Sequence, residues 1–338
     1  MPAASDSFKI AAVQATPVYL DRDATIDKAC GLIAEAGRNG ACLIVFPESF
    51  VPAYPDWVWA VPPGQVGLLN ELYARLLDNA VEIPSAATQR LCQAAKRAKA
   101  HVVMGMTERN TEASGGSLYN TLLYIDAQGN ILGKHRKLVP TGGERLVWAQ
   151  GDGSTLEVYD TPFGKLGGLI CWENYMPLAR YAMYAWGTQV YVAATWDQGE
   201  PWLSTLRHIA KEGRAFVIGC CMALRKADVA EKAESVQPFY KGLGEWINGG
   251  DSAIVNPDGE IIAGPLHNEE GILYAEIDPA QMSGPKWMLD VAGHYARPDV
   301  FELIVHTDAR PMITSKAGAP GPDGSTPRKT TRRKQATR

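Results

Sequence analysis

Apolar runs of strand length alternate along the chain with amphipathic stretches of helical length, and this alternation restricts the fold more than any other feature. Strands are predicted over 8–15 and 41–48, with an amphipathic helix over 23–38 between them. A second helix is predicted over 85–100, with Ser85 as its N-cap. Such alternation is typical of α/β proteins, in which helices pack on the faces of a sheet.

Three predicted hairpins interrupt this alternation: "AQGN" (127–130) and "TPFG" (161–164) each separate two strand-like runs, and the third hairpin lies within 250–264. Antiparallel hairpins do not fit a purely parallel doubly wound sheet, so we expect mixed sheets with helices packed outside. The polar, aperiodic segment 225–246 is predicted to be a loop. Because no repeat or Pro/Gly-rich linker divides the chain earlier, we predict one α/β domain over residues 1–314.

The charge of the chain is distributed unevenly. The formal net charge is -4, but residues 316–338 alone carry seven Lys and Arg against one Asp, which leaves about -10 for the rest. An acidic body argues against nucleic acid as a partner. The remaining segment, residues 315–338, is basic, rich in Pro, Gly, Ser and Thr, and almost devoid of apolar side chains, so it is predicted to be a disordered tail.

Several site and targeting motifs are missing from the sequence. The six cysteines form no CxxC pair, the six histidines show no ligand spacing, and no GxGxxG or GxxxxGK[ST] loop is present. The N-terminus does not read as a signal peptide, and no apolar run approaches the roughly 18 residues that span a bilayer. We therefore expect a reduced, cytoplasmic, soluble protein that needs no metal or organic cofactor and has no membrane partner.

Three polar residues lie at or just past the ends of predicted strands: Glu48 in "LIVFPESF", Lys137 in "GKHRKLVP" and Cys171 in "GGLICWEN". Strand ends open into the mouth of an α/β fold, where sites usually lie. A thiol with an ordinary pKa of about 8.5 needs a base, and a glutamate beside it can take the proton. A lysine beside both can stabilise the anion that develops on a substrate. Together they would form a nucleophilic unit that needs no histidine.

The stretches "FPESFVPAYP", "GKHRKLVPTGGERLVW" and "GGLICWENYMPLAR" resemble the three signature regions of the nitrilase family, in the carbon–nitrogen hydrolase superfamily, and occur in the family order. The resemblance continues through Thr195–Asp197, Arg207–Val217 and Gly293–Leu303, so that it covers roughly residues 8–305. It implies a four-layer αββα sandwich in which the Glu, Lys and Cys of these regions gather between strand ends as the catalytic residues.

The resemblance also suggests residues around this unit. Glu144, in "TGGERLVW", matches a further family glutamate that is expected to orient substrate or water. Trp57, Trp59, Trp172 and Trp196 are candidates for the substrate pocket, although plain packing explains Trp57 and Trp59 equally well. The backbone N–H of Trp172 is a candidate donor to a developing anion.

The implied reaction hydrolyses a nitrile with two waters to a carboxylic acid and ammonia, through a cysteine thioimidate and a thioester. Other readings stay open: an amide-cleaving branch, a cyanide-specific hydrolase, whose members resemble "CWEH" where this chain has Asn174, and an inactive scaffold on the same fold. The family also implies self-association into dimers through the helix after the nucleophile, here about 177–186, and into longer spirals. The identity of the nitrile stays open.

Overall fold

The computed structural model, which describes residues 7–313, contains two six-stranded sheets. The first sheet has the order β14 (Gly271–Ile277), β1 (Phe8–Gln14), β2 (Ala41–Val45), β3 (His101–Arg109), β4 (Leu118–Ile125), β5 (Ile131–Arg136). The second sheet has the order β13 (Ile261–His267), β12 (Gly250–Val255), β9 (Phe216–Cys221), β8 (Val190–Thr195), β7 (Gly164–Gly168), β6 (Tyr159–Thr161). A small separate sheet pairs β10 (Leu224–Arg225) with β11 (Trp246–Asn248).

Both sheets are mixed, as the sequence predicts. Strands β1, β2 and β3 run parallel in the first sheet, and β7, β8 and β9 run parallel in the second. The three predicted hairpins are confirmed as the antiparallel pairs β4–β5, β6–β7 and β12–β13. The hairpins therefore extend each sheet beyond its parallel centre, and the parallel strands need helical crossovers.

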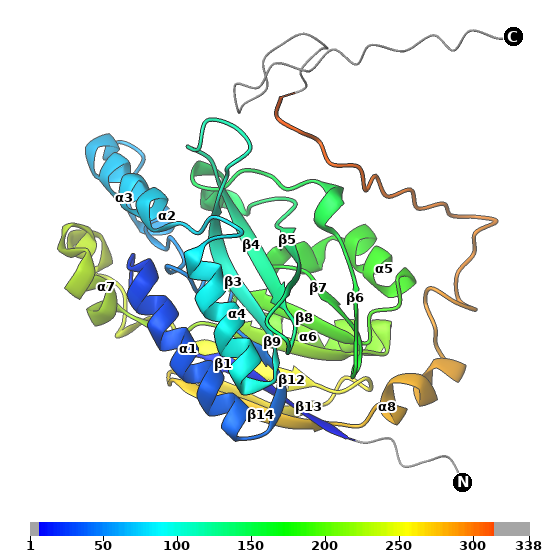
Figure 1. Ribbon diagram of the computed structural model, residues 1–338. Coiled ribbons are helices and arrows are strands. Elements are labelled where there is room, and N and C mark those ends of the chain that lie inside the picture. Colours follow the sequence, from blue (N-terminus) through cyan, green and yellow to red (C-terminus); the bar gives the residue numbers. More distant parts are fainter. Residues whose placement is uncertain (1–6, 314–338) are drawn as a thin grey trace, which may run out of the picture.

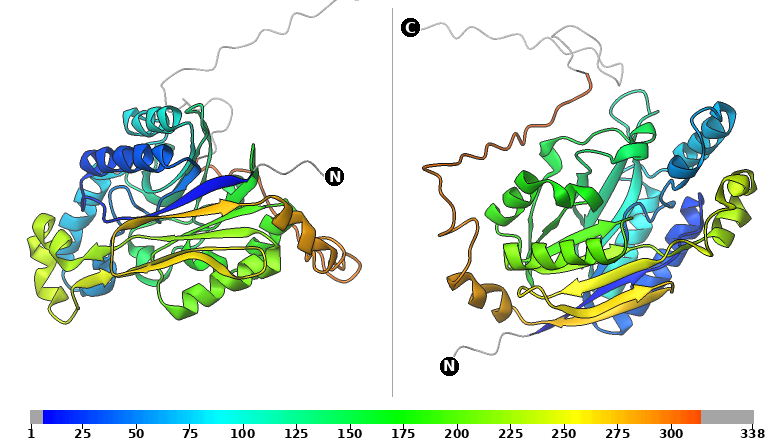
Figure 2. Two further views of the ribbon diagram at one scale, coloured as in Figure 1. Left: turned by 90° about the horizontal axis from the view of Figure 1, so that it is seen from below. Right: turned by 180° about the vertical axis from the view of Figure 1, so that it is seen from behind.

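Helices cover the outer face of each sheet. Figures 1 and 2 show α1 (Arg22–Arg38) and α4 (Ala86–Ala98) on the first sheet, and α5 (Pro177–Ala185) and α6 (Glu200–Gly213) on the second, with the two sheets face to face between them. The predicted N-cap of α4 is confirmed, because the Ser85 side chain accepts from the backbone N–H of Thr88. This arrangement is the four-layer αββα sandwich that the resemblance implies.

The alternation of side chains along each strand builds three parallel layers of core. On β1, Ile10 packs between the two sheets, while the next residue, Ala11, packs under α1 and α4. On β8, Val192 packs between the sheets and Tyr191 packs beneath α5 and α6. Both faces of the central strands are thus buried, which explains why these strands are continuous apolar runs rather than alternating ones.

The segment 225–246, predicted to be a loop, is largely helical. It contains α7 (Lys226–Lys232) and a 3-10 helix, η4 (Glu234–Tyr240). Few of its side chains are buried, chiefly Val229, Val236 and Tyr240, so the periodic apolar signal that marks a helix is weak there. Sequence reasoning also missed α2 (Trp57–Ala60) and α3 (Val66–Asn79), which pack with this segment in a fourth, aromatic-rich cluster.

The last described residues lie outside the sandwich (Figure 1). After β14 come the short helices α8 (Ala280–Ser283) and η5 (Gly284–Trp287), and residues 288–313 then run without helix or strand along the outside of the molecule (Figure 1). The predicted basic tail, residues 315–338, lies outside the described residues. Within residues 7–313, no helix is long and apolar enough to cross a membrane.

Candidate active site

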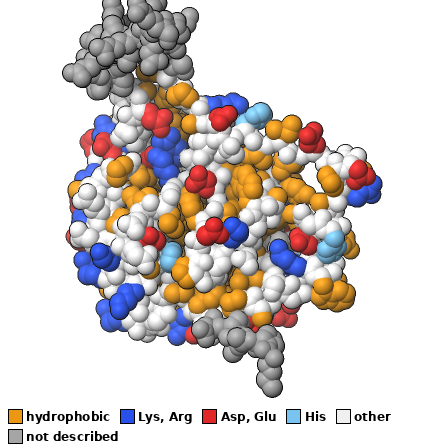
Figure 3. Space-filling model, turned by 45° about the vertical axis from the view of Figure 1, so that its right-hand side comes forward, with side chains coloured by type: hydrophobic (Ala, Val, Ile, Leu, Met, Phe, Trp, Pro, Cys, Tyr) orange, Lys and Arg blue, Asp and Glu red, His pale blue; other side chains and the backbone are white. Residues whose placement is uncertain are grey.

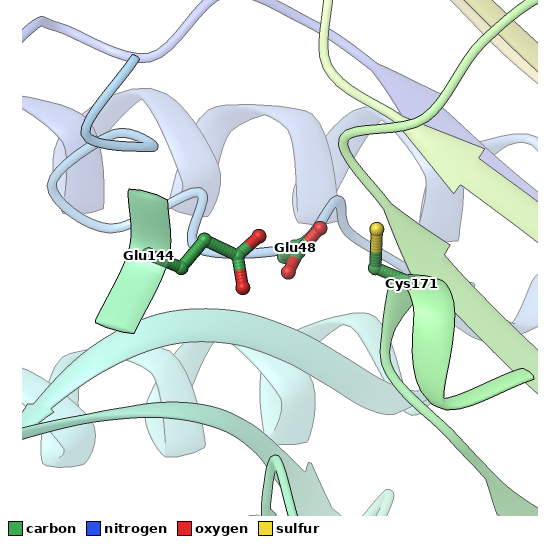
Figure 4. Close-up of side chains that lie close together, drawn as sticks. All are labelled: Glu48, Glu144 and Cys171. Carbon is green, nitrogen blue, oxygen red and sulfur yellow. The ribbon is translucent and has the colours of Figure 1, made fainter. Parts of the chain in front are cut away.

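The three predicted catalytic residues come from both sheets and meet between them. Glu48 lies just past β2, Lys137 directly follows β5, and Cys171 lies just past β7. All three are buried, with exposed fractions of 0%, 1% and 4%. Figure 4 shows Glu48 between Glu144 and Cys171. The structure therefore brings all four of these predicted residues into one cluster.

Glu48 is held in place by an unusually close approach of its backbone to β3. A Cβ atom added to Gly105 would lie 1.9 Å from the carbonyl oxygen of Pro47, so only glycine fits there. Ser49, which follows Glu48, has a φ of 48°, and its hydroxyl lies 2.9 Å from that of Thr107. The turn after β2 is thus fixed on both sides of the carboxylate.

Cys171 occupies a tight turn between β7 and the 3-10 helix η3 (Cys171–Tyr175). A Cβ atom on Gly168 would lie 2.0 Å from the carbonyl oxygen of Val192, which explains the glycine that ends β7. Cys171 itself has a φ of 51°, in the left-handed region, a conformation that costs about 1–3 kcal/mol for a residue other than glycine. The Asn174 side chain supports this turn by donating to the Cys171 carbonyl oxygen at 2.8 Å. Residues held this way are concentrated at active sites.

Lys137 forms the centre of the cluster. Its Nζ donates to Glu48 Oε1 at 2.8 Å and to Glu144 Oε2 at 2.7 Å. Asn120, on β4, donates from its side chain to Glu48 Oε1 at 2.6 Å and accepts from the Lys137 backbone N–H at 2.8 Å. The other carboxylate oxygen of Glu48, Oε2, has no hydrogen-bond partner within residues 7–313.

The carboxylates of Glu48 and Glu144 lie close to the thiol of Cys171. One carboxylate oxygen each of Glu48 and Glu144, and Sγ of Cys171, all lie within 4.8 Å of one another. Among residues 7–313, Glu48 thus has one oxygen without a hydrogen-bond partner, in the cluster that contains the Cys171 thiol. The separation of up to 4.8 Å between Sγ and a carboxylate oxygen can shorten when substrate binds.

Burial and neighbouring charges set the protonation of the cluster. Burial raises the pKa of Glu48 to about 6, although the ammonium of Lys137 opposes the rise. Burial also raises the pKa of Cys171 well above its ordinary value, and the charge of Glu48 adds to this, while Lys137 lowers it. Burial disfavours the ammonium of Lys137, but the charges around it outweigh burial and raise its pKa. At neutral pH the cluster therefore holds a thiol, an ammonium and an ionised base.

The spacing of Glu48, Glu144 and Cys171 would suit a divalent cation by distance alone. The Lys137 ammonium, however, is hydrogen-bonded to both carboxylates and already supplies the positive charge that such an ion would bring. Removing two acceptors from this lysine to coordinate a metal would leave a buried, unpaired ammonium. The residues present fit a lysine-centred site rather than a metal site.

Glu144 is held by a network that sequence reasoning missed. Its Oε2 accepts from the Thr141 backbone N–H at 2.7 Å, and its Oε1 accepts from the Tyr54 hydroxyl at 2.8 Å. The indole N–H of Trp59 donates to the same hydroxyl at 3.0 Å, and Trp196 stacks on the Tyr54 ring with centroids 4.2 Å apart. Tyr54 lies in the quoted stretch "FPESFVPAYP", six residues after Glu48, but nothing in the local pattern pointed to its role.

The four candidate pocket tryptophans lie in different environments. Trp59 and Trp196 both contact Tyr54, next to Glu144. Trp172 is half exposed beside Cys171, and its indole N–H donates to Asp197 at 2.8 Å. Trp57 is buried in the aromatic-rich cluster with α3 and η4.

Comparison with known proteins identifies the family. The model of the carbon–nitrogen hydrolase family matches residues 9–284. An aliphatic nitrilase of Sinorhizobium fredii is 41% identical over 325 residues, covering 92% of this chain and 99% of that protein. A bifunctional nitrilase/nitrile hydratase of Nicotiana tabacum is 42% identical, covering 88% of this chain and 85% of that protein.

The fold agrees with this assignment. The crystal structure of Saccharomyces cerevisiae Nit3, a member of branch 10 of the nitrilase superfamily, superposes with a TM-score of 0.69 at 22% identity, covering 86% of this chain and 97% of that one. The family model matches most of the chain, and the nitrilase relatives match it over nearly their whole length. The chain therefore belongs to the carbon–nitrogen hydrolase family and, within it, to the nitrilases.

Proposed function

We propose that this nitrilase attacks its substrate through Cys171, with Glu48 as the general base and Lys137 as the group that stabilises developing negative charge. The observation that carries this proposal is the unpartnered Oε2 of Glu48 in a cluster with Sγ of Cys171. The thiol is protonated at rest, so it needs that base when it attacks. Glu144 supports the unit by accepting a second hydrogen bond from the Lys137 ammonium.

The proposed reaction begins when Sγ adds to the nitrile carbon. The thiol proton passes to Glu48, and the nitrile nitrogen becomes protonated, which gives a thioimidate bound to Cys171. Water activated by Glu48 adds to the thioimidate carbon and forms a tetrahedral intermediate. This intermediate expels ammonia and leaves a thioester, and a second water releases the carboxylic acid and restores the thiol. In this proposal, the Lys137 ammonium stabilises the charge that develops on the nitrogen and oxygen of these intermediates.

A second outcome of the same intermediate is the amide. If the tetrahedral carbon expels the Cys171 sulfur instead of ammonia, the product is the amide after a single hydration. Relatives such as the bifunctional nitrilase/nitrile hydratase of Nicotiana tabacum support this candidate. Protonation of the leaving nitrogen decides between the two outcomes, because a protonated nitrogen leaves as ammonia. We propose that the acid is the main product and the amide a side product.

The pocket proposal rests on the aromatic groups around Glu144. Trp59 and Trp196, which both contact the buried Tyr54, provide flat, apolar surface next to the candidate catalytic cluster, which suits nitriles with an apolar substituent. The named aliphatic nitrilase among the relatives favours including aliphatic nitriles alongside arylacetonitriles and aromatic nitriles.

We further propose self-association through the surface around α5. Trp172, Tyr175 and Leu178 have exposed fractions of 50%, 44% and 68%, whereas Met183 and Tyr184 pack inward. Figure 3, which turns the right-hand side of Figure 1 forward, shows apolar side chains spread across this part of the surface. We propose a dimer that forms through this surface. We also propose that the protein is cytoplasmic and has one catalytic domain over residues 1–314. Gel filtration distinguishes a dimer from a longer spiral.

The test of this function is ammonia release from a panel of nitriles and their matching amides, with the acid and amide products quantified. Wild type should release ammonia from nitriles, and Cys171→Ala should lose at least about 10⁴-fold in turnover while keeping its thermal unfolding profile. Release from amides alone would move the protein to the amide-cleaving enzymes. Appreciable turnover by Cys171→Ala would sink the assignment of the nucleophile, and no release from any compound would favour an inactive scaffold.

A further inference from the structure

Glu173 is a buried carboxylate beside the candidate nucleophile, and none of the steps above uses it. Its exposed fraction is 1%, and it carries three sets of hydrogen bonds. Oε1 accepts from the backbone N–H of Leu138 at 2.6 Å, and Oε2 accepts from the backbone N–H of Ile170 at 2.8 Å. His135 Nε2 lies 3.2 Å from Oε1 and 3.0 Å from Oε2.

The two backbone groups belong to the two segments that must meet for catalysis. Leu138 directly follows Lys137, and Ile170 directly precedes Cys171. Lys137 follows β5 in the first sheet, whereas Cys171 follows β7 in the second. One carboxylate therefore ties the end of a strand in one sheet to the end of a strand in the other, through residues that are direct neighbours of the candidate catalytic residues.

The carboxylate has polar partners on every side. His135 Nδ1 lies 3.2 Å from the carbonyl oxygen of Thr155, and its Nε2 lies 3.0 Å from Glu173 Oε2, so the ring bridges the carboxylate and the backbone. Burial alone would raise the pKa of Glu173, but His135 and the two backbone N–H groups outweigh burial and lower it. The carboxylate thus stays ionised, and each of its oxygens keeps one backbone donor.

We infer that Glu173 is a positioning residue, whose carboxylate holds Lys137 and Cys171 at a fixed separation across the two sheets. The inference rests on the catalytic roles proposed above for those two residues. The geometry fits this role because a carboxylate has two equivalent acceptor oxygens at a fixed spacing, and here each is bonded to a different segment. A displacement of about 1 Å between reacting groups can cost about 100-fold in rate, so such a link has a measurable effect.

The test is Glu173→Gln, assayed for kcat, KM and the rate at which iodoacetamide alkylates Cys171. Glutamine has one acceptor oxygen and one NH₂ group, so it can keep the bond to Leu138 or to Ile170 but not both. We expect kcat to fall by about 100-fold and Cys171 alkylation to slow, with KM within about twofold of wild type. A fall in stability alone would not produce this separation of kcat from KM.

Glu108→Gln is the matched control. Glu108 is also a buried carboxylate, with an exposed fraction of 2%, and it accepts from Lys134 and Arg136. These two residues lie on the face of β5 opposite to that of His135. The control therefore removes a comparable buried ion pair from β5 without touching the link to the cysteine segment. We expect a similar fall in thermal stability with kcat within about twofold of wild type.

Each outcome decides the question. Wild-type kcat and alkylation in Glu173→Gln would overturn the inference, and so would an equal loss of kcat in Glu108→Gln. If Glu173→Gln does not fold, His135→Leu tests the same link, because it removes the imidazole that contacts both carboxylate oxygens. A fall in kcat of about tenfold is expected, and an unchanged kcat overturns the inference. If wild type itself shows no turnover that depends on Cys171, the proposed function fails, and the alkylation rates still test the link.

Discussion

Glu48 and Glu144 both accept from the same ammonium: Lys137 Nζ lies 2.8 Å from Glu48 Oε1 and 2.7 Å from Glu144 Oε2. Glu48 follows β2 and Glu144 follows β5, and both strands belong to the first sheet. The lysine joins the two carboxylates near Cys171, which follows β7 of the second sheet. This pairing leaves the second oxygen of Glu48 free of hydrogen bonds within the described part of the chain. The arrangement leads to predictions beyond the tests given above.

The first prediction concerns the acid side of the pH–rate profile. Because burial raises the pKa of Glu48 to about 6, this carboxylate takes up a proton as the pH falls through that value and can no longer accept one from Cys171. The value of kcat/KM should therefore fall about tenfold per pH unit below about pH 6. The measurement is kcat/KM for one nitrile from pH 4.5 to 9, and a flat profile down to pH 4.5 would contradict it.

The second prediction uses Asn120, whose side chain donates to Glu48 at 2.6 Å and thereby favours the ionised form. Asn120→Leu removes this donor, so the pKa of Glu48 should rise further and the acid limb of kcat/KM should move to higher pH. The same pH series measures the shift. A limb that stays where it is in wild type would show that the side chain of Asn120 does not tune the base.

The third prediction concerns stability without the ammonium. Lys137→Met leaves the buried Glu48 carboxylate without its main compensating charge, and breaking a buried ion pair typically costs about 3–5 kcal/mol at neutral pH. Because Lys137 lowers the pKa of Glu48 in wild type, its loss raises that pKa further above the unfolded value. The folded variant then binds a proton more tightly than the unfolded chain does, so its stability rises as the pH falls.

Urea unfolding of Lys137→Met and wild type at pH 8 and pH 5 checks this prediction. The deficit in the free energy of unfolding should be smaller at pH 5 than at pH 8. A deficit that is equal at both pH values would show that Glu48 does not take up a proton in the variant.

The fourth prediction concerns Tyr54, whose hydroxyl donates to Glu144 at 2.8 Å while its ring stacks on Trp196. Tyr54→Phe keeps the stacked ring but leaves Glu144 Oε1 without this donor. Hydrogen bonds to charged groups contribute about 1.5–3 kcal/mol, so kcat/KM should fall by about 10- to 100-fold. Trp59→Phe, which removes a donor to Tyr54 rather than to the carboxylate, serves as the control and should have the smaller effect.

Much of the sandwich could be predicted because its central strands are buried on both faces and its outer helices on one. The run ending at Val45 and the amphipathic helix α1 carry these patterns clearly. The segment containing α7 does not, since only Val229 of that helix is buried. The helix forms there through packing with residues distant in sequence, which a local pattern does not record.

In the candidate site, too, residues in local motifs could be predicted and residues defined by distant contacts could not. Glu48, Lys137 and Cys171 could be predicted because each stands in a long motif at the end of a strand. Asn120 and Tyr54 could not, because their roles depend on hydrogen bonds to residues 72 and 90 positions away in the sequence. Such partners are decided by how the strands are ordered in the sheets rather than by the residues next to them.

The pairing of two carboxylates with one ammonium also bears on how the product leaves. The candidate catalytic cluster carries one more negative than positive charge, in a buried place where charges act strongly on one another. A nitrile enters as a neutral molecule, but its acid leaves as an anion, which the cluster repels. An amide is neutral and feels no such repulsion. The same charges that prepare the thiol would thus clear the finished acid from the pocket, and the acid should inhibit the enzyme more weakly than the amide of the same substituent.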